Sequence, residues 1–98
     1  MKLRLLVTSL FTTIAAVAAD GGFLFATFKG EATPMTEQVY FGLSKDGREW
    51  DALNDAEPVL VSKRGEKGVR DPFMLRSHDG KKTFIIATDL SIHLNHNW

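Results

Sequence analysis

From Gly22 onward, the apolar residues fall in short runs that are separated by turn residues, and this spacing is not that of amphipathic helices. Two of the turns share the pattern Ser-x-Asp-Gly, at residues 44–47 and 77–80. Asp-Gly between two alternating segments is a strong short-range signal for a β-hairpin. The chain is therefore predicted to be all-β, with about five or six antiparallel strands.

The turns also set a repeat along the chain. We expect strands over residues 22–28, 38–44, 59–61, 70–76 and 83–90, with residues 62–69 as a charged loop. The two Asp-Gly turns lie 33 residues apart. Strand, turn and strand repeated at tens of residues are typical of β-propeller blades, each a four-stranded sheet of roughly 40 to 50 residues. The chain has room for fewer than two such blades.

The first 19 residues have the pattern of a secretory signal. Lys2 and Arg4 precede an apolar run over residues 5–19, which ends in the small residues of Ala16-Val17-Ala18. A membrane anchor is the alternative, but a spanning helix needs roughly 20 apolar residues, and this run contains four Ser or Thr residues. We therefore expect a signal over residues 1–19, one domain over residues 20–98, and a secreted protein outside the membrane after cleavage.

Charge and cysteine content narrow the classes of function. The chain has 12 basic and 12 acidic residues, and removal of Lys2 and Arg4 with the signal leaves 10 basic residues. This balance gives no attraction to nucleic acid or to an anionic membrane surface. There is no cysteine, although exported domains of this size often depend on disulfides. Such a short β chain has marginal stability, which favours a piece of a larger domain.

Asp71 is the first candidate for chemistry. It lies between Arg70 and Pro72, directly after the glycine-containing loop. Because proline disfavours the α region for the residue before it, we expect Asp71 to be extended and its carboxylate to be held in one direction, as a general base requires. The alternative is an ion pair with Arg70 or Arg76, or hydrogen bonds within a turn, and from spacing alone this structural role is the more common one.

Four segments in order resemble the opening blade of glycoside hydrolase family 43. They are Gln38 to Gly47 followed by Trp50, Glu57-Pro58-Val59-Leu60, Gly68-Val69-Arg70-Asp71-Pro72-Phe73, and Thr83 to Asp89. Members of this family are five-bladed β-propellers. The resemblance implies that antiparallel hairpins of this chain form the first one to two blades of such a propeller, which is incomplete here.

The resemblance also implies site residues. Asp71 matches the catalytic base, and Arg70 and Phe73 would bind substrate, although a Phe on a strand is more often part of a core. The family's second aspartate and its acid glutamate lie on later blades, so the fragment would lack the acid. The implied reaction is inverting hydrolysis of arabinose- or xylose-containing plant polysaccharide. No cofactor or metal is implied, apart from the calcium ion that some members hold in the central channel.

Several alternatives stay open. Glu66 and Asp89 could substitute as catalytic carboxylates, but neither matches a family position. His93 and His96 suggest a metal site only weakly, because further ligands are missing, and a solvated loop is the more common outcome. The chain could instead be an exported carbohydrate-binding module with an aromatic platform, or the product of a truncated reading frame. A propeller piece should show an unpaired hydrophobic edge, and a closed barrel would contradict it.

Overall fold

A computed structural model describes residues 21–96. Five strands and two short helices follow one another in the order β1 (Phe23–Thr27), β2 (Tyr40–Ser44), β3 (Asp51–Ala52), η1 (Asn54–Ala56), β4 (Val69–Arg76), β5 (Thr83–Asp89) and α2 (Ile92–Asn95). The signal expected over residues 1–19 lies outside the described residues. Within the described residues, the helices are all too short to cross a membrane.

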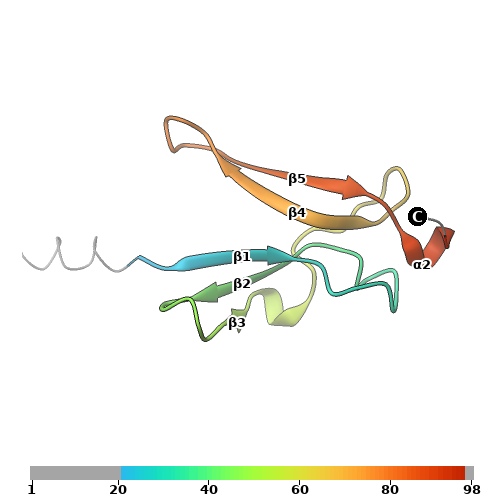
Figure 1. Ribbon diagram of the computed structural model, residues 1–98, viewed down its shortest axis with the longest axis horizontal. Helices are drawn as coiled ribbons and strands as arrows, with labels where there is room; N and C mark the ends of the chain where they lie inside the picture. Colours follow the sequence, from blue (N-terminus) through green and yellow to red (C-terminus); the bar gives the residue numbers. More distant parts are fainter. Residues whose placement is uncertain (1–20, 97–98) are drawn as a thin grey trace, which may run out of the picture.

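The strands form two antiparallel sheets. One sheet has the order β1-β2-β3, and the other is the β4-β5 hairpin. Strands β1 and β4 lie beside each other without pairing, so the hairpin lies along the three-stranded sheet (Figure 1). The all-β class and the antiparallel hairpins are confirmed. Neither sheet has the four strands of a complete blade, in agreement with an incomplete propeller.

The two Ser-x-Asp-Gly turns have closely similar structures. In each, an Asp Oδ1 accepts the backbone N–H two residues further on, at 2.8 Å for Asp46 and 3.0 Å for Asp79. The hydroxyls of Ser44 and Ser77 donate to the same carboxylates at 3.1 and 2.6 Å. These bonds favour the charged form, so the pKa of both carboxyls lies below the usual value, chiefly through the backbone N–H for Asp46 and the Ser77 hydroxyl for Asp79. The predicted hairpin turns are confirmed.

The interior is small and largely polar. Val39 and Tyr40 are the buried apolar residues of the described chain, and Glu37, Gln38 and Ser91 are buried with them. The Gln38 amide bonds to backbone groups of three loop residues, Pro34, Ser62 and Lys67. Buried polar groups need such partners, and here they join loops that are far apart in sequence. A polar network therefore does much of what an apolar core does in a larger domain.

One face of the β4-β5 hairpin is apolar and exposed. The register pairs Phe73 with Ile86 and Leu75 with Phe84, so these four side chains share a face. Each is more than half exposed, and Phe73 reaches 62%. Within residues 21–96, β4 and β5 pair only with each other, and the strands close no barrel. This confirms the expected hydrophobic edge.

Two details differ from the sequence-based expectation. Residues 59–61 form no strand, because Leu60 makes a single bridge to Val39. Residues 92–95 form the short helix α2 instead of a loop, because the Ser91 hydroxyl accepts the N–H of Leu94 and caps the first turn. Neither residues 59–61 nor residues 92–95 have the alternating or periodic apolar pattern from which a strand or a helix can be predicted.

Candidate active site

Asp71 lies in a β-bulge of strand β4. Pairing runs from Arg70 opposite Thr88 directly to Phe73 opposite Ile86, so Asp71 and Pro72 share one position of the partner strand. Asp71 has a φ of 48°, so the expectation of an extended residue is wrong. The bulge is the reason, because its extra residue leaves the β region, and Asp tolerates left-handed φ better than most residues. Proline has no backbone N–H, and Pro72 lies at the bulge, where the pairing of β4 with β5 is interrupted.

The Asp71 carboxylate is exposed and makes no hydrogen bond or ion pair with any residue from 21 to 96. The alternative role expected for it, pairing with Arg70 or Arg76, is therefore not what the structure contains. A left-handed non-glycine residue costs about 1 to 3 kcal/mol, and such strain gathers at functional sites. Asp71 thus combines a constrained backbone with an acceptor that is open to a ligand or a water molecule.

Arg70 points into the interior instead. Its Nη1 atom lies 2.8 Å from Oε1 of Glu37 and 3.4 Å from Oε2 of Glu31. The guanidinium also lies 4.7 Å from the centre of the Phe28 ring. Only 7% of Arg70 is exposed. These contacts give Arg70 a structural role, and its expected contact with substrate stays a prediction.

Glu37 is the centre of the buried network beside Asp71. It is fully buried, and its carboxylate accepts hydrogen bonds from the Ser91 hydroxyl at 2.6 Å, the Ile92 N–H at 2.8 Å and the His93 N–H at 3.2 Å, besides Arg70. Burial by itself raises the pKa of Glu37, but these four donors outweigh it, so the pKa lies below its usual value. The Glu37 carboxylate is therefore charged, and both of its oxygens already accept hydrogen bonds from the chain.

Glu66 and Asp89, the two alternative carboxylates, hold the loop before β4. Asp89 Oδ1 accepts the Glu66 N–H at 2.9 Å, and Glu66 Oε2 accepts the Ser91 N–H at 3.2 Å. Gly68 lies so close to the next segment that an added Cβ would overlap the Leu90 carbonyl group. The loop is therefore closed tightly against the end of β5, immediately before the bulge.

Phe73 lies two residues beyond Asp71, opposite Ile86 in the hairpin. Its exposure leaves an aromatic face that could stack on the apolar side of a sugar ring. The contact with substrate that the resemblance implies stays a prediction. The aromatic platform of the carbohydrate-binding alternative also stays a prediction: Phe25 and Trp50 are exposed, with ring centroids 5.5 Å apart and planes tilted by 55°.

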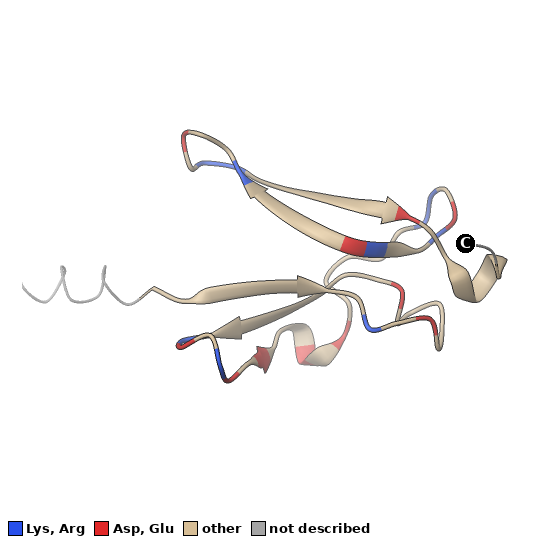
Figure 2. Ribbon diagram, in the orientation of Figure 1, with Lys and Arg blue, Asp and Glu red and all other residues tan. Residues whose placement is uncertain are grey.

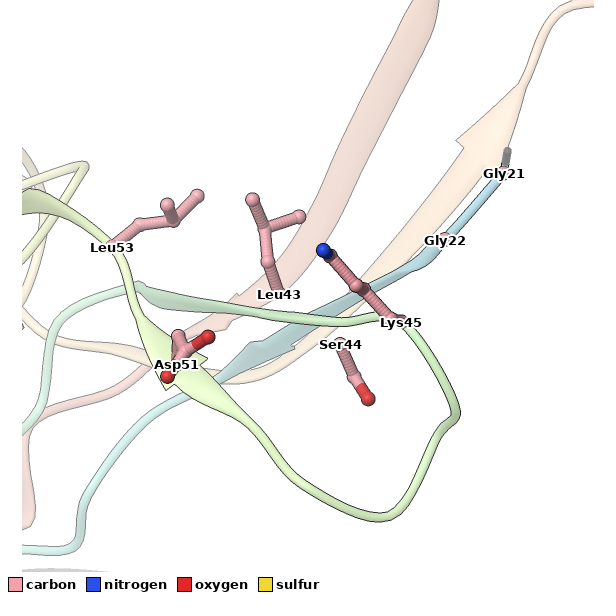
Figure 3. A pocket seen from close by; sticks show the side chains of 7 residues that line it. All are labelled: Gly21, Gly22, Leu43, Ser44, Lys45, Asp51 and Leu53. Carbon is pink, nitrogen blue, oxygen red and sulfur yellow. The ribbon is translucent and has the colours of Figure 1, made fainter. Parts of the chain in front are cut away.

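An open hollow of about 570 Å³ lies elsewhere (Figure 3). It belongs to the three-stranded sheet and the segments beside it, and its lining residues are Gly21, Gly22, Leu43, Ser44, Lys45, Asp51 and Leu53. None of these residues is part of β4. The hollow is open, and the resemblance to family 43 assigns no site residue to it, so we place the candidate site at Asp71 on chemistry and not on size.

The charged residues lie mostly in turns and loops, while most of the strand length is uncharged (Figure 2). Asp51, Arg76 and Asp89 lie at strand ends, and Arg70 and Asp71 place opposite charges within the body of β4. Over residues 21–96, no three His, Cys, Asp or Glu side chains come together as a metal site would require. His93 instead uses Nδ1 in a 3.1 Å contact with the Glu31 carbonyl oxygen.

Comparison with known proteins defines the class. The family described as "Probable glycosyl hydrolase domain" matches residues 19–98, and the chain belongs to this family, which is related to glycoside hydrolase family 43. The chain is also 32% identical, over 77 residues, to a protein named alpha-L-arabinofuranosidase from Bifidobacterium longum subsp. longum. That match covers 78% of this chain but 7% of the relative's length. No solved structure matches the chain significantly.

Sequence reasoning did not identify Glu37. It stands in the polar stretch Thr36-Glu37-Gln38, which has the composition of an exposed loop before a strand. Its importance comes from contacts with residues 33 to 56 positions away in the chain. A polar residue buried by such distant contacts leaves no local pattern in the sequence.

Proposed function

We propose that this chain supplies the catalytic base of a secreted glycoside hydrolase that acts on arabinose- or xylose-containing polysaccharide. The observation that carries the proposal is the Asp71 carboxylate, which is exposed, unpaired within residues 21–96 and fixed by a strained bulge. Support for the class comes from membership of a glycosyl hydrolase domain family. Support for arabinose comes from the name of the relative, alpha-L-arabinofuranosidase. This chain matches 7% of that relative's length.

In the proposed reaction, Asp71 acts as general base. Its carboxylate takes a proton from a water molecule, and the water oxygen forms a bond to the anomeric carbon as the bond to the leaving oxygen breaks. A separate carboxylic acid must protonate that leaving oxygen. Inverting enzymes place the two carboxyl groups roughly 6.5 to 9.5 Å apart, which leaves room for the water. An exposed base without an intramolecular partner can accept this water.

Three carboxylates near the bulge are poorly suited to be the acid. Glu37 is buried, Asp89 accepts the Glu66 N–H of the loop, and Glu66 accepts the Ser91 N–H beyond β5. We propose that the acid and the other blades come from the rest of a complete five-bladed propeller, as the resemblance to family 43 implies. The chain alone would then bind water at Asp71 without turning over substrate.

The proposal is tested by incubating the complete enzyme with aryl arabinofuranoside and aryl xyloside. Release of the aryl group measures hydrolysis, and proton NMR of the first sugar formed measures its anomeric configuration. Inversion at the anomeric carbon is the expected result. Retention of configuration would contradict the role of Asp71 as a base that activates water, and no release from either substrate would contradict the sugar class.

A further inference from the structure

We propose that Glu37 is a positioning residue that holds Asp71 in its active orientation by fixing the two residues before it. This inference rests on the proposed function of Asp71. The Glu37 carbonyl oxygen accepts the N–H of Val69 at 2.8 Å, and its carboxylate accepts Nη1 of Arg70 at 2.8 Å. One residue thus holds both the backbone and the side chain that lead into the bulge.

The same carboxylate also holds the other strand of the hairpin. Strand β5 ends at Asp89, and the following residues donate to Glu37 through the Ser91 hydroxyl and the N–H groups of Ile92 and His93. At the open end of the hairpin, the buried Glu37 side chain therefore joins the start of β4 to the segment that follows β5. Thr88, opposite Arg70, lies within this closed end.

Asp71 needs such support because its own side chain provides none. Its carboxylate makes no bond within the described chain, so the backbone is the part of Asp71 that its surroundings hold in place. That backbone has an unfavourable φ, which persists only where the surroundings determine it. Catalysis is sensitive to the position of the base, and a displacement of about 1 Å can lower the rate about 100-fold. If Arg70 lost its contact with Glu37, Asp71 would be displaced first, because it is the next residue in the chain.

Glu37 also controls the charge beside the base. Arg70 lies next to Asp71, and its charge is balanced by Glu37 and, at longer range, by Glu31. On β5, Ala87 lies opposite the bulge and Thr88 lies opposite Arg70, and both are uncharged. If Glu37 loses its charge, Arg70 acts more strongly on the neighbouring carboxylate and favours its ionised form. The base then becomes weaker.

The test compares Glu37→Gln with Glu31→Gln in the complete enzyme, with Asp71→Asn as reference. Glutamine keeps the shape of Glu37 but has one acceptor oxygen for four donors. We expect kcat of Glu37→Gln to fall about 10- to 100-fold, with KM changed less than about twofold. The acidic limb of the pH profile of kcat/KM should move to lower pH. Both profiles are corrected for the folded fraction that circular dichroism gives at each pH, because stability itself falls in acid.

Glu31 is half-exposed and 3.4 Å from Arg70, so Glu31→Gln should keep kcat within about twofold. A folded Glu37→Gln enzyme with normal kcat and an unmoved acidic limb would overturn the inference while Asp71→Asn stayed inactive. An active Asp71→Asn enzyme would instead overturn the proposed function and the inference with it. If Glu37→Gln does not fold, Ser91→Ala removes one 2.6 Å bond to the same carboxylate, and unchanged kcat there would count equally against Glu37.

Discussion

Nη1 of Arg70 lies 2.8 Å from Oε1 of Glu37, a carboxylate 33 positions earlier in the chain, and Arg70 leaves its neighbour Asp71 without an ion pair. Adjacent residues of a strand point to opposite faces, and the bulge at Asp71 changes this alternation locally. The Arg70 guanidinium is buried against Glu37, and the Asp71 carboxylate stays at the surface. This separation leaves the Asp71 carboxylate open to a ligand or a water molecule.

The first prediction concerns the stability of this chain. Glu37→Gln should lower the free energy of unfolding by about 3 to 5 kcal/mol, because it removes the buried charge that pairs with Arg70 at 2.8 Å. Glu31→Gln should lower it by less than about 1 kcal/mol, because Glu31 is half-exposed. Urea unfolding followed by circular dichroism measures both. Equal losses in the two variants would show that burial of Glu37 is not what matters.

The second prediction concerns pH. The pKa of Glu37 is lower in the folded chain than its ordinary value of 4.5, so its contribution to stability is complete above that value and is lost as pH falls through the folded pKa. The donors that stabilise the charge are Ser91, the N–H groups of Ile92 and His93, and Arg70. Stability measured between pH 7 and pH 3 should therefore fall in acid.

Glu37→Gln has no such group to protonate, so its stability should depend less on pH over this range. The lowered pKa values of Asp46 and Asp79 act in the same direction and equally in both proteins. The difference between the variant and the unchanged chain therefore isolates Glu37. The same pH dependence in the variant and the unchanged chain would contradict the assignment.

The third prediction concerns the loop before the bulge. Gly68→Ala should loosen this loop, because the new Cβ overlaps the Leu90 carbonyl group and backbone atoms cannot move aside easily. Gly42→Ala is the matched control, since its Cβ meets Asp51 and Trp50 at 3.6 Å, an ordinary contact. Limited proteolysis within residues 62–68 should be faster in Gly68→Ala than in Gly42→Ala. Protection of the loop in both variants would show that the close approach is not a constraint.

The fourth prediction concerns the exposed face of the hairpin. The side chains of Phe73, Leu75, Phe84 and Ile86 form an apolar surface that should bind a hydrophobic dye and promote self-association of this chain. Ile86→Lys should reduce both effects. Thr83→Lys adds the same charge on the opposite face of the hairpin and should change them little. Light scattering and dye fluorescence measure the two responses, and equal effects of both lysines would point to net charge instead.

The fold was predictable where the pattern was local. The paired Ser-x-Asp-Gly turns indicated the two hairpin turns, and their hydrogen bonds agree because each depends on residues within a few positions. The alternating runs located β1, β2, β4 and β5 to within a few residues. Residues 59–61 were misassigned, because an apolar triplet has strand composition whether or not a partner strand lies beside it.

The site was predictable only in part. Asp71 came from a resemblance and from its place before Pro72, but its left-handed backbone did not, because the bulge depends on how β4 pairs with β5. Glu37 was not predictable at all, since its four donors come from residues more than 30 positions away. Long-range polar contacts of this kind exist only in the folded chain.

The most direct test of Asp71 as the general base compares hydrolysis of aryl arabinofuranoside by the complete enzyme, its Asp71→Asn variant and its Asp79→Asn variant. Asp79 is exposed in the turn of the same hairpin, so the control makes the same chemical change away from the site. As the general base, Asp71 requires that Asp71→Asn lower kcat at least about 100-fold, the lower end of what general base catalysis contributes, while Asp79→Asn stays within about twofold. Full activity in Asp71→Asn would show that Asp71 is not the base and return it to a structural role.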